Sequence, residues 1–241
     1  MVSGVGITPS HRSNDGLQLQ AEKRFLGNRN VAGALTVVFS YTYSKTFECN
    51  HRLNNWNLSE PCVHELSNYD KPQNIAFSGV WDIPFGKGRH WLTSPNKYLK
   101  PFIEGWTASW IYRFTSGVPV SAMNVQYLCS SVLTENQSHD HWFNNDPKCY
   151  RNLPNYTLRT IPDRFAWLRQ MDNPRLDVST SKTFPIHERW KFYLRGEATN
   201  VMNKPLYGGP DTGFQNVRFG MLPVGQQNFP RIVQLSGKIL F

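Results

Sequence analysis

The chain has 241 residues and a formal net charge of +9. No run of Lys and Arg exceeds two residues, so the basic tract typical of a nucleic-acid-binding surface is absent and we expect no nucleic-acid partner. No apolar run approaches the ~18 residues that a membrane helix requires. Because the strands of a membrane β-barrel alternate lipid-facing and lumen-facing residues, this excludes helical membrane proteins but leaves membrane barrels open.

Alternation with a period of two residues predicts the strands. The first covers residues 16–25, where Leu17, Leu19 and Ala21 share one face and Gln18 and Gln20 the other. A Gly/Asn turn is expected at 26–30, and the second predicted strand covers 31–45. This strand is longer than the ~5–6 residues of an average strand in a soluble protein. It suits a tilted strand that crosses a bilayer, which needs ~9–11 residues. The further strands are expected at 73–83, 105–117, 175–184, 190–200 and 231–241.

One face of these strands is rich in aromatic residues. In the strand at 105–117, Trp106, Trp110, Tyr112 and Phe114 lie on one face, and the other face is polar or charged except for Ile111. In a membrane barrel such a face contacts lipid, with rings concentrated near the two interfaces. The predicted lipid-facing aromatic residues are Phe39, Tyr41, Tyr43, Trp81, Trp106, Trp110, Tyr112 and Phe114.

The connections between the strands alternate between short or medium and long. The long ones cover about 46–71, 118–172 and 201–230. This is typical of outer-membrane barrels, which have short periplasmic turns and long extracellular loops. The predicted fold is therefore all-β, an antiparallel up-and-down meander forming a partial transmembrane β-barrel of about seven strands with long extracellular loops. With the last strand descending to the periplasm, the first begins outside, so we expect further strands to precede this chain.

Several segments resemble the C-terminal barrel of TonB-dependent outer-membrane transporters, most closely the Oar-like type. They are YDKPQNIAFSGVWDIPFGKGR (69–89), GWTASWIYRFTSGVPV (105–120), NPRLDVSTSKTFPIHERWKFYLRGEATNVMNKPLYG (173–208) and RIVQLSGKILF (231–241). NDGLQLQAEKRF and FSYTYSKTF fit the same pattern, so the resemblance covers nearly the whole chain.

The resemblance also implies a role for the last strand. Barrels of this kind end in a strand that the barrel-assembly machinery is expected to read as polar, x, small, x, x, hydrophobic, x, aromatic. Gln234, Ser236, Ile239 and Phe241 occupy these positions. The family prefers Gly where Ser236 stands, and Gly237 comes one place later. An ordinary edge strand of a soluble domain is the alternative interpretation of this ending.

The resemblance further implies a barrel of ~22 strands, which seven strands cannot close. We found no counterpart of the signal peptide, TonB box or plug domain of these transporters in the 241 residues. Residues 1–241 are therefore interpreted as a C-terminal barrel segment in the bacterial outer membrane, not competent for transport alone. The expected partners are outer-membrane lipid, the barrel-assembly machinery, an unknown transported ligand, and TonB only through a plug that this sequence does not contain.

The four cysteines lie in two of the long loops. Cys49 and Cys62 share one loop, and Cys129 and Cys149 share the other. Disulfides within each loop would suit an oxidising periplasmic route, but four cysteines allow three pairings, and free thiols remain an alternative. A zinc site is less favoured because the chain has no CxxC pair.

Other candidate chemistry is weak. SHDHW offers His139, Asp140 and His141, but adjacent ligands rarely converge on one metal, so a solvated loop is expected there. Arg195 and Glu197 share a polar strand face and are expected to form an ion pair in the barrel lumen. We predict no catalytic, cofactor-binding or metal-binding residue, no cofactor and no enzymatic activity.

A second hypothesis is a secreted all-β module, for example one that binds carbohydrate. In that fold the aromatic face would be the core and a second sheet would cover it. In a membrane barrel the same face stays bare. The covering of Trp106, Trp110, Tyr112 and Phe114 therefore distinguishes the two hypotheses.

Overall fold

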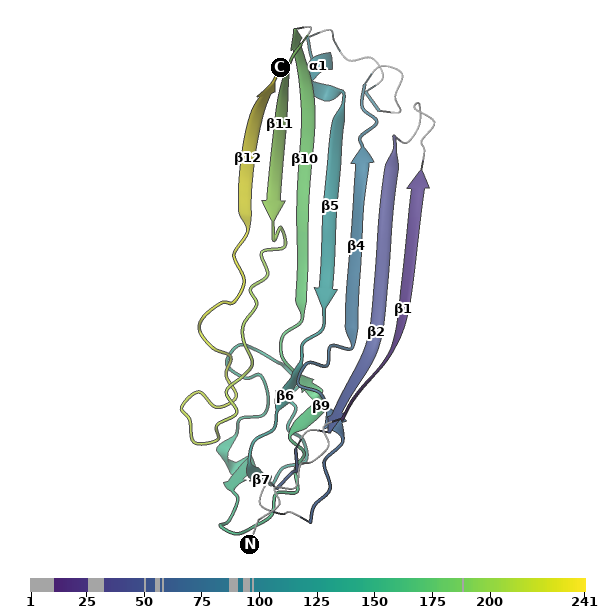
Figure 1. Ribbon diagram of the computed structural model, residues 1–241. Coiled ribbons are helices and arrows are strands. Elements are labelled where there is room, and N and C mark those ends of the chain that lie inside the picture. The colour runs from purple at the N-terminus through teal and green to yellow at the C-terminus, as the bar shows by residue number, and fades with distance from the viewer. Residues whose placement is uncertain are drawn as a thin grey trace.

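The computed structural model describes residues 11–25, 33–49, 51–54, 57, 59–86, 91–92, 96, 98–187 and 189–241. One large antiparallel sheet dominates it (Figure 1). Its strands in spatial order are β1 (His11–Phe25), β2 (Leu35–Cys49), β4 (Gln73–Asp82), β5 (Trp106–Thr115), β10 (Asn173–His187), β11 (Trp190–Thr199) and β12 (Ile232–Leu240). Short β3 (Glu65–Leu66) adds to the end of β2.

This arrangement confirms the predicted up-and-down antiparallel fold. The seven strands of the main path follow one another in sequence order, and each pairs antiparallel with the main-path strand that precedes or follows it. β1 and β12 are the two edges of the sheet, and within the described residues the sheet does not close into a barrel. The expected turn at 26–30 lies outside the described residues.

The register brings the apolar faces of all seven strands together. Phe39 of β2 lies opposite Phe77 of β4, which lies opposite Tyr112 of β5. Farther along, Trp110 pairs with Val178 of β10, and Val178 with Ala198 of β11. Since side chains in paired positions point to the same side of a sheet, one face is apolar across its whole width.

A glycine and a lysine are accommodated among the aromatic rings of this face. Gly79 lies opposite Trp110, and a Cβ on Gly79 would come within 2.3 Å of the indole ring, so the glycine makes room for the ring. Lys182 interrupts the apolar face toward the short turns. Its ammonium is 4.8 Å from the Phe184 ring centroid and 5.6 Å from that of Trp106, so the rings shield the charge.

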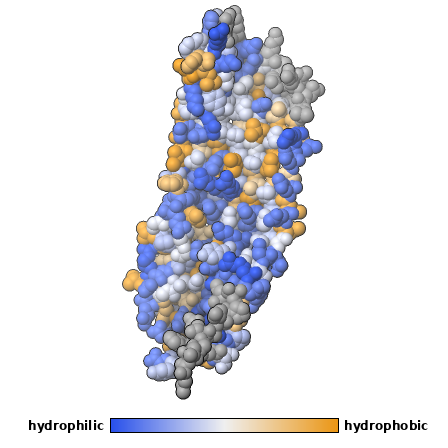
Figure 2. All heavy atoms as spheres, in the orientation of Figure 1, coloured by the Kyte–Doolittle hydropathy of each residue, from blue (hydrophilic) through white to orange (hydrophobic). Residues whose placement is uncertain are grey.

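The opposite face is mostly small and polar, with a few aliphatic side chains such as Ile111. Ser109 and Ser179 share a hydrogen bond of 2.7 Å across β5 and β10, and Thr107 donates to Asp82 at 2.9 Å. On the side turned to the viewer in Figure 2, the apolar patches lie mainly over the strands, whereas the lower end is largely hydrophilic.

The structure corrects several predicted boundaries. β1 and β2 continue past the predicted ends, because the polar segment His11–Asp15 pairs with Lys45–Cys49. Backbone hydrogen bonds extend these strands where no apolar alternation marks them. The connection between the strands expected at 175–184 and 190–200 is shorter than predicted, since β10 reaches His187 and β11 starts at Trp190.

The predicted irregular loop 118–172 also contains ordered elements. They are β6 (Pro119–Ser121), β7 (Val125–Tyr127), the 3-10 turn η1 (Pro147–Cys149), β8 (Tyr150–Asn152) and β9 (Arg164–Arg169). β6 pairs with β9 and β7 with β8. The connection between β4 and β5 carries the short helix α1 (Lys100–Ile103).

Candidate functional site

The three long connections gather at one end of the sheet, the lower end in Figure 1. We call the described parts of 46–71, 117–172 and 201–230 the loop cap. The cap has a hydrophobic core of its own, to which both 117–172 and 201–230 contribute. Its buried members are Val120, Met123, Val125, Val132, Phe143, Cys149, Tyr150, Leu168 and Phe219. The long loops therefore form a packed unit.

Aromatic edges fasten two of the loops together. Phe219, from 201–230, meets Phe143 and Tyr150, from 117–172, in edge-to-face contacts with ring centroids 5.2 and 4.9 Å apart. Beside them, the backbone N–H of Trp142 donates to the carbonyl of Gly220 at 2.8 Å. Gly220 has a φ of +78°, a conformation that favours glycine. Burial raises the pKa of the Tyr150 phenol, whose hydroxyl donates to the carbonyl of Asn144.

The structure pairs all four cysteines within the cap. Cys49 is joined to Cys62, and Cys129 to Cys149. The bridged residues are 13 and 20 positions apart, and closing loops of this size stabilises the folded state by about 3 kcal/mol each. Each disulfide lies within one loop, the pairing that sequence reasoning preferred among three.

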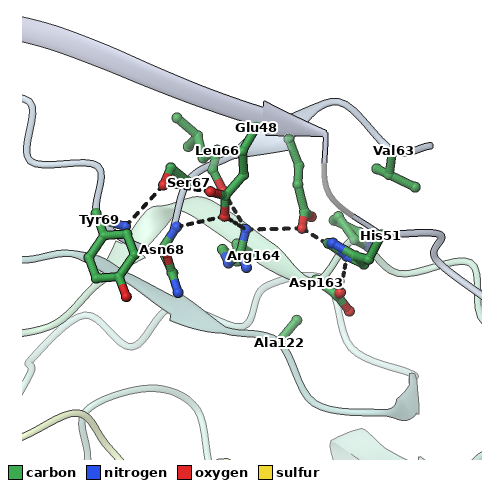
Figure 3. Close-up of polar contacts among 12 residues, drawn as sticks. Glu48, His51, Val63, Leu66, Ser67, Asn68, Tyr69, Ala122, Asp163 and Arg164 are labelled. Carbon is green, nitrogen blue, oxygen red and sulfur yellow. Dashed lines mark hydrogen bonds and ion pairs between the residues drawn. The ribbon is translucent and has the colours of Figure 1, made fainter. Parts of the chain in front are cut away.

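A buried ion network connects the end of β2 to the beginning of β9 (Figure 3). Arg164 Nη1 lies 2.8 Å from Glu48 Oε1, 3.1 Å from Glu65 Oε1 and 2.8 Å from the carbonyl of Leu66. Ser67 also donates to Glu48 at 3.0 Å. Because burying a carboxylate disfavours its charged form, the pKa of Glu65 is raised, against the opposing charge of Arg164.

His51 and Asp163 continue this network toward the surface. The Nε2 atom of His51 is 3.2 Å from Glu65 Oε1 and 2.5 Å from Asp163 Oδ2. Arg159 forms an ion pair with the other oxygen of Asp163. Sequence reasoning missed this group because its members come from positions 51, 65 and 163, and no local spacing signals their proximity.

The cap also contains two open hollows. One, of about 530 Å³, is mostly apolar and includes Tyr127, Leu133 and the stacked rings of Phe165 and Trp167. The other, of about 720 Å³, is lined by side chains of both kinds, among them three asparagines, Asn54, Asn57 and Asn124, and Leu153, Tyr156 and Arg159. Concave sites that combine apolar walls with a few polar groups are typical of ligand pockets.

The residues predicted from the sequence fall into separate places. The eight predicted lipid-facing aromatic residues all lie on the apolar face of the sheet: Phe39, Tyr41, Tyr43, Trp81, Trp106, Trp110, Tyr112 and Phe114. Arg195 and Glu197 form an ion pair of 2.9 Å on the opposite face. Their lumenal position remains a prediction.

The four residues predicted as the assembly signal occupy the edge strand β12 and its end. Gln234 and Ser236 share one face with the polar side of the sheet, and Ile239 lies on the apolar side. Phe241, which follows the strand, lies against Trp190 with ring centroids 5.5 Å apart. Recognition by the assembly machinery remains a prediction.

The SHDHW segment behaves as a surface loop. His141 and Asp140 are exposed, and His139 Nδ1 lies 3.0 Å from Asp140 Oδ1. This interaction lowers the pKa of Asp140. His139 Nε2 is 3.2 Å from the carbonyl of Pro223, so this ring links two loops of the cap.

Comparison with known proteins gives one match. The family model described as "Outer membrane beta barrel domain" matches residues 7–234. The searches of curated proteins and of solved structures return no match. Within the described part of the chain, no helix is long and apolar enough to cross a membrane.

Proposed function

The chain belongs to the outer membrane beta barrel domain family and is a protein of the bacterial outer membrane, and from that premise we propose that it forms wall strands and outside loops of a TonB-dependent transporter or receptor. In this role it has no catalytic activity. The wall strands separate lipid from a polar lumen, and the loop cap contacts the ligand. Energy reaches the barrel from TonB through a plug domain supplied by another part of the protein.

The observation that carries this proposal is the division of the sheet into two faces beside one packed end. An apolar face that spans the width of the sheet suits lipid, and the opposite face of serines, threonines and charged pairs suits a water-filled lumen. The hollows of the cap provide concave surface at the end where a ligand would arrive. Sequence similarity to the Oar-like type supports the TonB-dependent class.

The open edges support the proposal that the chain acts as part of a larger barrel. β1 and β12 each present an outer row of backbone N–H and C=O groups that lacks a strand partner in the described residues. In hydrocarbon such groups must be paired, because no water is present to satisfy them. We therefore expect further strands of the same barrel to pair with both edges, and we expect no transport from these strands alone.

The secreted binding module is not favoured. It requires a second sheet over the aromatic face, and the two further sheets among the described residues are two-stranded. Both belong to the loop cap, at the lower end of Figure 1.

Growth of the source bacterium tests the transporter function even while the ligand is unidentified. The strains are one lacking the coding region, one with the region restored, and one lacking TonB. Each receives limiting nutrients of one class at a time: iron chelates, oligosaccharides or oligopeptides. We expect at least one nutrient on which the deletion and the TonB-deficient strain both fail and the restored strain grows. Unimpaired growth of the deletion strain on every TonB-dependent nutrient would reject the transporter function.

A further inference from the structure

Three possible metal ligands converge where two loops of the cap meet. His51 and Glu65 come from 46–71, and Asp163 comes from 117–172. One potential ligand atom from each lies within 4.8 Å of the others. Figure 3 shows His51 directed at Asp163 across the gap between the two loops. We propose that His51, Glu65 and Asp163 bind a divalent transition-metal ion of the zinc type.

Hydrogen bonding alone accounts poorly for this geometry. His51 Nε2 faces two carboxylate oxygens, at 3.2 Å on Glu65 and 2.5 Å on Asp163. One ring nitrogen carries a single hydrogen or a single lone pair, so it can serve only one of these oxygens at a time. A cation between the three side chains would satisfy all of them at once.

The second carboxylate oxygen of Glu65 gives independent support. Only 6% of the Glu65 side chain is exposed, and its Oε2 atom is buried with no hydrogen-bond partner among the described residues. A buried acceptor without a partner costs about 1–3 kcal/mol, and more when it is charged. Coordination of a metal by this oxygen would remove that cost.

The neighbouring arginines leave ligand atoms available. Arg164 contacts Oε1 of Glu65, and Arg159 contacts Oδ1 of Asp163. Each carboxylate therefore keeps its other oxygen, Oε2 or Oδ2, for a metal. Outer hydrogen bonds of this kind hold coordinating carboxylates in position.

The supporting backbone is fixed on both sides. His51 lies within the loop closed by the Cys49–Cys62 disulfide, and its carbonyl accepts a hydrogen bond of 3.1 Å from the backbone N–H of Val63. Glu48 and Glu65 are paired in the β2–β3 ladder. The site therefore requires only small side-chain movements.

The distances suit a four-coordinate ion. Two ligands at 2.0–2.2 Å from a tetrahedral Zn²⁺ are about 3.3–3.6 Å apart. The ligand atoms of the three residues lie within 4.8 Å of one another, and the 3.2 Å from His51 Nε2 is to Oε1 of Glu65, so the Glu65 carboxylate would turn to bring Oε2 to the ion. Asp163 would withdraw by roughly 1 Å from its present 2.5 Å. One imidazole and two carboxylates match the borderline ligand preference of zinc. The fourth position faces solvent, because a quarter of the side chains of His51 and Asp163 is exposed.

Metal titration of the purified, full-length outer-membrane protein in detergent tests the site. After treatment with a chelator, Zn²⁺ binding is measured by calorimetry, and Co²⁺ binding by visible absorption. We expect one ion per chain in the unaltered protein. His51→Gln and the isosteric Glu65→Gln should each weaken binding by about 100-fold or more, since even changes around metal ligands cost ~10–100-fold. His141→Gln, which alters an exposed histidine elsewhere in the cap, should leave binding unchanged.

Hydrogen exchange gives a second readout and checks folding. Zn²⁺ should slow amide exchange around His51 and Asp163 in the unaltered protein and in His141→Gln, but not in Glu65→Gln. The proposal is wrong if the unaltered protein binds no Zn²⁺, in which case the three side chains form an ion pair only. It is also wrong if His51→Gln and Glu65→Gln retain the unaltered affinity, which would place a bound ion elsewhere.

Discussion

Two arginine substitutions at one depth of the sheet distinguish its lipid face from its lumenal face. Phe77 pairs with Tyr112 on the apolar face, and Ser78 pairs with Ile111 on the other. Phe77 and Ile111 therefore lie at nearly the same depth but point to opposite sides. Both are large apolar side chains with similar exposure, 36% and 42%. Phe77→Arg and Ile111→Arg thus form a matched pair.

The expected costs differ because the surroundings differ. An arginine on the lipid face near the bilayer midplane costs about 2–4 kcal/mol. Loss of the phenylalanine, which also packs against Trp110 at a ring distance of 5.9 Å, adds about 1.5–3 kcal/mol. Phe77→Arg should therefore destabilise the protein by roughly 4–7 kcal/mol. Ile111→Arg places the charge on the polar face, where the residues paired with position 111 are Ser78 and Asp177, and a cost of about 1 kcal/mol is expected.

Urea unfolding of the intact protein in lipid vesicles, followed by tryptophan fluorescence, measures both free energies. The amount of each variant in the outer-membrane fraction of cells gives a second readout. Equal costs, or a larger cost for Ile111→Arg, would refute the assignment of the aromatic face to lipid. A larger cost for Ile111→Arg would instead indicate that the other face is the one in contact with hydrocarbon.

Three further predictions concern packing and pH. Phe143 is fully buried in the cap core, so Phe143→Ala should lower the free energy of unfolding by about 3–5 kcal/mol and speed amide exchange across the cap. Val217 is 96% exposed, so Val217→Ala should change neither quantity. Equal effects of the two substitutions would argue against a packed cap core. Gly79→Ala should lower the free energy of unfolding in the urea assay by about 1–3 kcal/mol, because the new Cβ would lie 2.3 Å from the indole ring of Trp110. At Gly196 the nearest atom to such a Cβ is 3.8 Å away, so Gly196→Ala should have a smaller effect. Burial raises the pKa of Tyr150 above its value in the unfolded chain, so the cap should keep its stability below pH ~10 and lose it as the pH rises further. Tyrosinate absorbance and the rate of amide exchange in the cap should then increase together. Slow exchange that persists while Tyr150 ionises would contradict this prediction.

A metal ion bound by His51, Glu65 and Asp163 would give the cap a further link between two of its loops. The Cys49–Cys62 and Cys129–Cys149 disulfides each close a single loop, whereas the proposed metal would join 46–71 to 117–172. The Glu48–Arg164–Glu65 ion pairs already join the same two segments. Both surround the point where the sheet meets the cap, so ligand-contacting loops would be held to the rigid wall.

The strands were accessible from the sequence because their signal is local. Side chains in a strand alternate every two residues, so Trp106, Trp110 and Phe114 identify a face even where the neighbouring strands are unknown. All seven predicted strands occur in the main sheet, in chain order. The strand ends at His11 and Cys49 were missed, because ladder hydrogen bonds alone define them there.

The cap was decided only by tertiary structure. Its core brings Phe143 into contact with Phe219, and its ion network pairs Glu65 with Arg164. These residues are far apart in the sequence, and the period-two pattern of single strands does not indicate that they meet. The pairing of four cysteines also depends on which loops fold back on themselves. The antiparallel sheet with one lipid-compatible face could be predicted from the amino-acid sequence, because period-two alternation is a property of neighbouring residues. Long-range packing determined the loop cap and the cluster at His51, because their members meet only after the strands bring the loops to one end.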